Sequence, residues 1–90
     1  MGVSICLHKF FQQYCDGEEI IDVQGTTINE CLLHMIEKYP DLKKAIFTGK
    51  DKLHPLVGVF LNSSSVYPDV LEKKVKDGDK VHLIHTLAGG

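Results

Sequence analysis

Ninety residues provide material for one hydrophobic core, and 43% of them are hydrophobic, so the chain is expected to fold as one small domain. Twelve acidic and ten basic side chains leave a formal net charge of −2, which excludes the strongly basic surface that nucleic acid or an anionic membrane would attract. No apolar run is long enough to span a membrane and no signal peptide precedes the first expected strand, so we expect a cytoplasmic protein.

The first expected elements are two strands joined by a long connection. Residues 3–8 alternate between apolar and polar with a period of two, which places Val3, Ile5 and Leu7 on a core face. The pair Asp16-Gly17 is typical of a turn and precedes a second strand at about residues 19–24. These features predict a hairpin.

A helix is expected to begin after Thr27. Residues 27–30 form a capping box, in which the Thr27 hydroxyl accepts a hydrogen bond from the Glu30 N–H while the Glu30 carboxylate reaches back. Pro40 restricts Tyr39 and ends the helix there. The apolar residues between these two signals recur at helical spacing and define one buried stripe: Ile28, Cys31, Leu32, Met35, Ile36 and Tyr39.

The second half of the chain is expected to complete a sheet. Residues 41–54 form a charged connection, and residues 55–62, the most apolar run, are predicted to be a central strand. A turn at residues 62–65 leads to at most a short edge strand at Val66-Tyr67, and residues 80–86 form the last strand. Three apolar residues are expected to anchor the charged connection: Leu42, Ile46 and Phe47. The order predicts an α+β fold, a β-grasp in which one main helix covers one face of a mixed sheet.

Alternation along the last two long strands separates a core face from an outer face. With Val57, Val59 and Leu61 turned toward the helix, the intervening residues must point outward, and Phe60 and Ile84 are expected to form an exposed apolar pair. Apolar anchors beside a functional terminus are where binding energy concentrates, although single exposed apolar residues are also common and harmless. We therefore predict a partner-binding patch made of Leu56, Phe60, His82 and Ile84.

The chain ends in Leu87-Ala88-Gly89-Gly90, directly after the last expected strand. Glycine has no Cβ atom, so such a tail can enter a slot that admits only backbone, and four extended residues reach about 13–14 Å at roughly 3.3–3.6 Å each. We therefore expect a folded domain over residues 1–86 and a flexible tail over residues 87–90 that presents the Gly90 carboxylate to a partner. A frayed terminus without function is the alternative.

Residue types that carry catalysis or bind metals do not occur at a functional spacing. The three cysteines lack a Cys-x-x-Cys pair, the five histidines are scattered, and no phosphate-binding loop or paired nucleophile and base is present. We predict no catalytic residue and no metal site.

Together these features resemble the ubiquitin-like sulfur-carrier family, which includes the small subunit of molybdopterin synthase and the thiamine sulfur carrier. The resemblance spans residues 3–90. It rests on the Gly17-Glu18-Glu19 hairpin, the helix ending at Tyr39-Pro40, the strand at residues 57–62, the turn at residues 76–79 and the terminal Ala88-Gly89-Gly90. The chain differs at His85-Thr86, where relatives often have proline, at Gly58 and at residues 63–65.

The resemblance implies a carrier protein or non-catalytic subunit that binds no cofactor itself. A partner adenylyltransferase of the ubiquitin-activating type would adenylate the Gly90 carboxylate with ATP and Mg²⁺, and a sulfur donor would then produce a thiocarboxylate. Chain length favours delivery of the sulfur to molybdopterin, with the large subunit of molybdopterin synthase as a further partner. Thiamine, cysteine or methionine synthesis, a protein modifier joined to lysines through Gly90, and a plain interaction domain stay open.

Overall fold

The computed structural model describes residues 2–49 and 52–86 of the chain. Within these ranges five strands and three helices follow one another. Their bounds are β1 Val3–Leu7, α1 Lys9–Gln12, β2 Ile20–Val23, α2 Ile28–Lys38, α3 Leu42–Ile46, β3 Val57–Leu61, β4 Ser64–Ser65 and β5 Lys80–His85.

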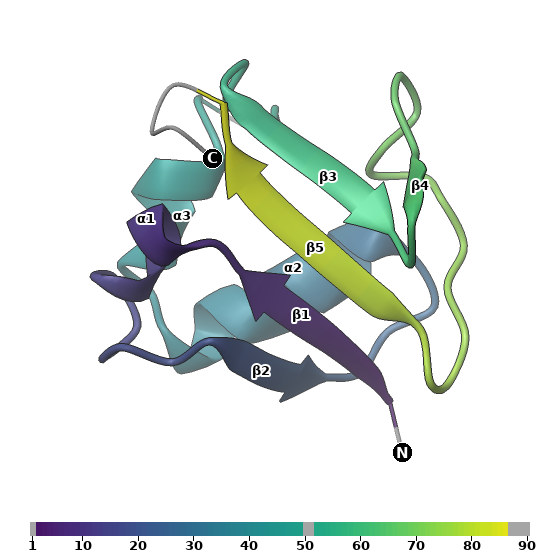
Figure 1. Cartoon of the computed structure of the whole chain (residues 1–90), viewed down its shortest axis with the longest axis horizontal. Helices are drawn as coiled ribbons and strands as arrows, with labels where there is room; N and C mark the ends of the chain where they lie inside the picture. Colours follow the sequence, from purple (N-terminus) through teal and green to yellow (C-terminus); the bar gives the residue numbers. More distant parts are fainter. Residues whose placement is uncertain (1, 50–51, 87–90) are drawn as a thin grey trace.

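The described strands form one mixed sheet with the order β2-β1-β5-β3-β4. β1 pairs antiparallel with β2 and parallel with β5, and β3 pairs antiparallel with β5, so the arrows of β1 and β5 point the same way in Figure 1. The middle position belongs to β5. β3 lies between β5 and β4, so it is an interior strand, as expected for the most apolar run, although part of its apolar surface lies on the outer face of the sheet.

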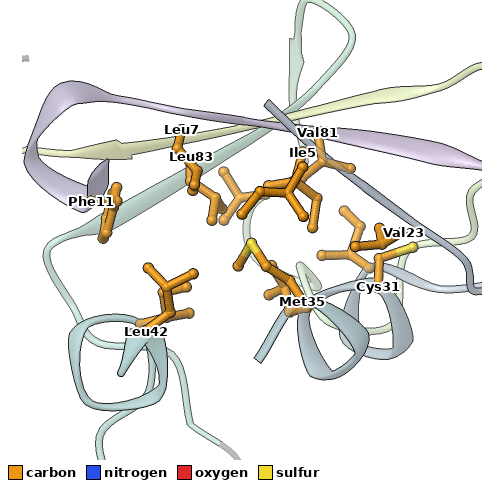
Figure 2. Close-up of a cluster of buried hydrophobic side chains, with 14 of the residues drawn as sticks. Ile5, Leu7, Phe11, Val23, Cys31, Met35, Leu42, Val81 and Leu83 are labelled. Atoms are coloured by element: carbon orange, nitrogen blue, oxygen red, sulfur yellow. The ribbon is translucent and has the colours of Figure 1, made fainter. Parts of the chain in front are cut away.

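The helix α2 lies behind the sheet and covers one face of it (Figure 1). Side chains from the sheet and from the helices meet between the two layers, as Figure 2 shows for Ile5, Val81 and Met35, all of which are completely buried. Burial at about 25 cal/mol per Å² of apolar surface is the main stabilising term for such a core. The arrangement is the predicted α+β fold of the β-grasp type.

The start of α2 is capped almost as the sequence predicts. The Glu30 N–H donates to the Thr27 Oγ1 at 3.2 Å. The Glu30 carboxylate reaches back one residue further than in a standard capping box, because it accepts hydrogen bonds from the Thr26 N–H at 2.7 Å and the Thr26 hydroxyl at 2.9 Å. Three polar groups at the helix start are therefore satisfied by one carboxylate and one hydroxyl.

Two short helices lie in segments that were expected to be connections. α1 follows β1, and α3 lies within the charged connection, whose expected anchors Leu42, Ile46 and Phe47 are buried. Neither helix is capped by a side-chain hydrogen bond from the residue before it, and both are too short to show a helical period. Among the described helices none is long and apolar enough to cross a membrane.

The edge strand β4 was predicted two residues too late in the chain. Asn62 adopts a left-handed conformation with φ of 57°, so the turn is complete at Ser63 and β4 is Ser64–Ser65, not Val66-Tyr67. Asparagine is one of the few residue types that tolerate this conformation. The expected turn at residues 62–65 was therefore too long.

The turn at residues 76–79 is fixed to this hairpin by a buried carboxylate. Asp79 is 8% exposed and accepts hydrogen bonds from the Lys76 N–H at 3.0 Å and from the Asn62 side-chain amide at 3.3 Å. The Asn62 amide oxygen in turn accepts from the Lys80 N–H at 3.0 Å. These bonds fix the residue at which β5 begins. They therefore also fix its register against β3 along the whole strand.

Candidate functional site

The candidate site lies where β5 ends. Because β1 and β5 are parallel, their carboxyl ends lie side by side at the same end of the sheet, together with the beginning of β3 (Figure 1). The His8 N–H donates to the Leu83 carbonyl at 3.0 Å, and the Thr86 N–H donates to the Leu56 carbonyl at 2.8 Å. The backbone is thus held on the β1 side as far as Leu83 and on the β3 side as far as Thr86. The predicted site residues Leu87, Ala88, Gly89 and Gly90 lie outside the described residues.

Aromatic rings lie around His85, the last residue of β5. The His85 ring stacks on Phe10, with ring centroids 4.0 Å apart and an angle of 29° between the planes, and the His54 ring lies 6.3 Å from His85. The Leu56 N–H donates to the His54 Nδ1 at 3.1 Å, so the segment that receives the Thr86 bond is itself held. His85, a departure from relatives that have proline, is therefore fixed by ring packing in this chain.

The predicted patch residues lie together on the outer face of the sheet. Phe60 is the register partner of His82, and Ile84 is the partner of Gly58, while Leu56 precedes β3 on the same face. All four patch residues are half-buried. The prediction that Phe60 and Ile84 are exposed is therefore wrong, although both lie on the predicted face. The two side chains occupy diagonal positions on neighbouring strands, where they shield each other in part.

Gly58 explains how Ile84 is accommodated. A Cβ atom at Gly58 would lie 2.8 Å from the Cγ1 of Ile84 and 3.1 Å from its Cδ1, which is closer than ordinary van der Waals contact. Ile84 therefore lies directly over the glycine backbone. The sequence contains a signal for this contact, because a glycine inside an otherwise apolar strand often marks the close approach of another group.

The cysteines and histidines form no metal site within the described part of the chain. All three cysteines are free thiols. Burial raises the pKa of the Cys15 and Cys31 thiols, which keeps them protonated and unreactive. Cys6 lies on the outer face of the sheet, opposite His82 in the register of β1 and β5.

Comparison with known proteins agrees with this fold. The model of the ThiS family matches residues 9–90. A candidate sulfur carrier protein of Archaeoglobus fulgidus is 34% identical over 93 residues, and the match covers 100% of both chains.

Solved structures extend the comparison. A chain in the crystal structure of the BexX/CysO complex of Amycolatopsis orientalis is 26% identical with a TM-score of 0.88, covering 99% of this chain and 100% of that one. The solution structure of small archaeal modifier protein 1 from Methanosarcina acetivorans, at 24% identity, has the same fold with a TM-score of 0.84, covering 98% of this chain and 95% of that one. The chain belongs to the ThiS family and has the ubiquitin-like β-grasp fold of the sulfur carriers.

Proposed function

We propose that this protein is a sulfur carrier whose Gly90 carboxylate is adenylated by a partner enzyme and converted to a thiocarboxylate. The observation that carries the proposal is the end of β5. The strand is hydrogen-bonded to a neighbouring strand on each side, and the ring of its last residue, His85, stacks on Phe10. The sequence continues from Thr86 directly into Leu87-Ala88-Gly89-Gly90. A terminus with this sequence, attached to so firmly held a strand, is suited to insertion into the active site of a partner.

The chemistry requires activation from outside. A free carboxylate is a poor electrophile, whereas an acyl-adenylate has AMP as a good leaving group. ATP and Mg²⁺ would belong to an adenylyltransferase of the ubiquitin-activating type, and a sulfur donor would displace AMP and leave the thiocarboxylate on Gly90. This chain then acts as a substrate and subunit without catalytic residues of its own.

The patch on the outer face is proposed to dock the activating enzyme. Leu56, Phe60 and Ile84 provide an apolar surface on the same face, with His82 among them, close to where the tail begins. Ile84 precedes the last described residue, Thr86, by only two positions. A partner that binds this patch would hold the tail within the roughly 13–14 Å that four extended residues span.

For the receiving pathway we propose molybdopterin synthesis, with the large subunit of molybdopterin synthase as the partner that accepts the sulfur. Chain length supports this choice over the shorter thiamine carriers. Thiamine, cysteine or methionine synthesis are the competing pathways, and the carrier chemistry at Gly90 would be the same in each.

A protein modifier is the second candidate function. The same activated Gly90 could be attacked by a lysine amine, which would give an isopeptide bond in place of a thiocarboxylate. The family match and the 34% identity to a candidate sulfur carrier favour the carrier.

Mass spectrometry of the protein isolated from its own cells tests this choice. The carrier predicts an intact chain in which one oxygen is replaced by sulfur. Recovery of Gly90 joined to lysines of other proteins, with no sulfur-containing form, would instead establish the modifier.

A further inference from the structure

We propose that the outer edge of β3 and the groove beside it form a second interaction surface, which binds an extended segment of a partner protein that carries basic side chains. This surface differs from the tail and from the patch on the outer face, and the proposal does not depend on the chemistry of Gly90.

The first argument is the unfinished pairing of β3. Its outer edge pairs with β4 only at Phe60 and Leu61, because β4 ends after two residues. The bond from the Thr86 N–H to the Leu56 carbonyl shows that even-numbered residues of β3 turn their backbone groups toward β5. Val57 and Val59 therefore turn theirs toward the outer edge, since these directions alternate along a strand.

The backbone groups of Val57 and Val59 that point to the outer edge are only partly engaged in hydrogen bonds. The Val57 N–H donates to the His54 carbonyl at 3.0 Å. Within residues 2–49 and 52–86, β3 pairs on this edge only with β4, so neither Val57 nor Val59 has a strand partner there. A carbonyl and an N–H separated by one residue on the same edge are the two groups that one residue of an added extended chain can bond.

The second argument is the groove itself. A hollow of about 410 Å³ lies beside this edge, and its lining includes Leu53 and Val57 together with Tyr67 and Leu71 from the segment after β4. Tyr67 is 82% exposed, an unusual degree for so large a side chain that lines a groove. An open groove with apolar walls beside a free strand edge fits an extended peptide with alternating side chains.

The third argument is charge. The charged side chains among the described residues that line the groove are both acidic, Asp69 and Glu72. Both side chains are exposed, and among residues 2–49 and 52–86 neither carboxylate has an ion pair or a hydrogen bond from another side chain. A basic side chain on the occupant would supply the missing partner. The tail of this chain is a poorer occupant, because the Gly90 carboxylate has the same sign as the groove.

The opposite edge of the sheet shows a contrasting arrangement. On β2 the Asp22 carbonyl accepts a hydrogen bond from the Lys38 ammonium group at 2.8 Å, and the Gln24 N–H donates to the His34 Nδ1 at 2.9 Å. Side chains of α2 thus occupy the β2 edge, which is a common way to prevent strand addition. The β3 edge has no such cover among the described residues.

The test is a titration of the isotope-labelled full chain with a short synthetic peptide, followed by NMR. The probe is acetyl-Gly-Leu-Arg-Leu-Arg-Gly-amide, which combines an extended backbone with apolar and basic side chains. We expect saturable shifts of the Leu53, Val57, Val59 and Leu71 amides, and no saturable shifts from a control peptide with Glu in place of Arg.

Protein variants make the test specific. The double variant Asp69→Lys/Glu72→Lys should weaken peptide binding by roughly tenfold, since two ion pairs are lost. The matched control Glu18→Lys/Glu19→Lys reverses two exposed charges elsewhere and should bind as well as the natural chain. Deletion of Gly90 should change nothing.

Four results would overturn the proposal: no saturable shift at this edge, shifts centred on β2 or on the outer face, equal binding of the Glu peptide, or equal weakening by the control variant. Failure of Gly90 to become adenylated would bear on the proposed function and not on this groove.

Discussion

A single glycine determines the shape of the proposed docking patch. Because Ile84 lies over Gly58, Gly58→Ala should force the Ile84 side chain to move, at a cost of about 1 kcal/mol in the free energy of unfolding. In the Ile84→Ala background the same change should cost much less, since the conflicting atoms are gone. Urea denaturation of the four proteins measures both values, and equal costs in the two backgrounds would show that Ile84 does not cover the glycine.

Phe60 is the best test of the patch at the level of a single side chain. Phe60→Asp should weaken activation by the partner by about 1–2 kcal/mol, the typical loss of an interface anchor, and leave the chain folded. The matched control is Leu33→Asp on α2, because Leu33 is 47% exposed and lies on the helix and not on the outer face of the sheet. Steady-state kinetics of adenylation with both variants gives the comparison.

Two outcomes of that experiment would contradict a docking role for Phe60. Unfolding of the Phe60→Asp variant would place Phe60 in the core. Equal loss of activation in the Leu33→Asp variant would mean that general destabilisation, and not docking, explains the effect.

The start of α2 offers a test at the scale of an element. The Thr27 hydroxyl accepts from the Glu30 N–H, so Thr27→Ala should lower the free energy of unfolding by about 1 kcal/mol. The midpoint of chemical denaturation measures this change. An unchanged midpoint would show that the helix is capped by another group.

The same helix start predicts a pH dependence. Hydrogen bonds from the Thr26 backbone N–H, and then from its hydroxyl, lower the pKa of Glu30 below its ordinary value of 4.5. A carboxyl whose pKa is lower in the folded state stabilises the fold above the unfolded pKa and loses this effect as the pH falls through the folded pKa. The contribution should therefore be complete above about pH 5 and disappear in more acid solution.

Glu30→Gln provides the corresponding measurement. The variant should be less stable than the natural chain at neutral pH, and the difference should shrink as the pH is lowered below 4.5. Glu37→Gln, on the exposed side of the same helix, is the control. A stability difference that stays constant down to strongly acid pH would contradict the assignment of these bonds.

The elements that the sequence predicted well are those with a clear period or a strong stop signal. β1 and α2 have regular apolar spacing, and Tyr39-Pro40 ends the helix as expected. α1 and α3 were missed because four or five residues do not establish a period, and their stability comes from buried side chains such as Phe11 and Ile46.

Strand order and the fine structure of the site depend on contacts between distant residues. β4 was misplaced because the left-handed conformation of Asn62 shortens the turn. The stacking of His85 on Phe10 joins the last strand to a short helix near the start of the chain, which no local pattern reveals. The four patch residues were nevertheless assigned to the correct face, because strand alternation is a local property.

At the scale of the whole molecule the fold separates three tasks. The core between sheet and helices provides stability, the outer face and the end of β5 serve the proposed activation, and the β3 edge is proposed to bind a different partner (Figure 1). Removal of Gly90 should therefore leave the thermal midpoint nearly unchanged, because this residue follows the last strand and contributes no side chain.

The central claim, that Gly90 is the activated group, is tested most directly by intact-mass spectrometry after reaction with a ubiquitin-activating-type enzyme, ATP, Mg²⁺ and a sulfur donor. The natural chain should show the mass change of one oxygen replaced by sulfur. Chains that lack Gly90, or that carry one extra residue after it, should stay unmodified although they remain folded. Normal activation of either variant, or no sulfur incorporation in the natural chain under conditions that activate a known carrier, would contradict the claim.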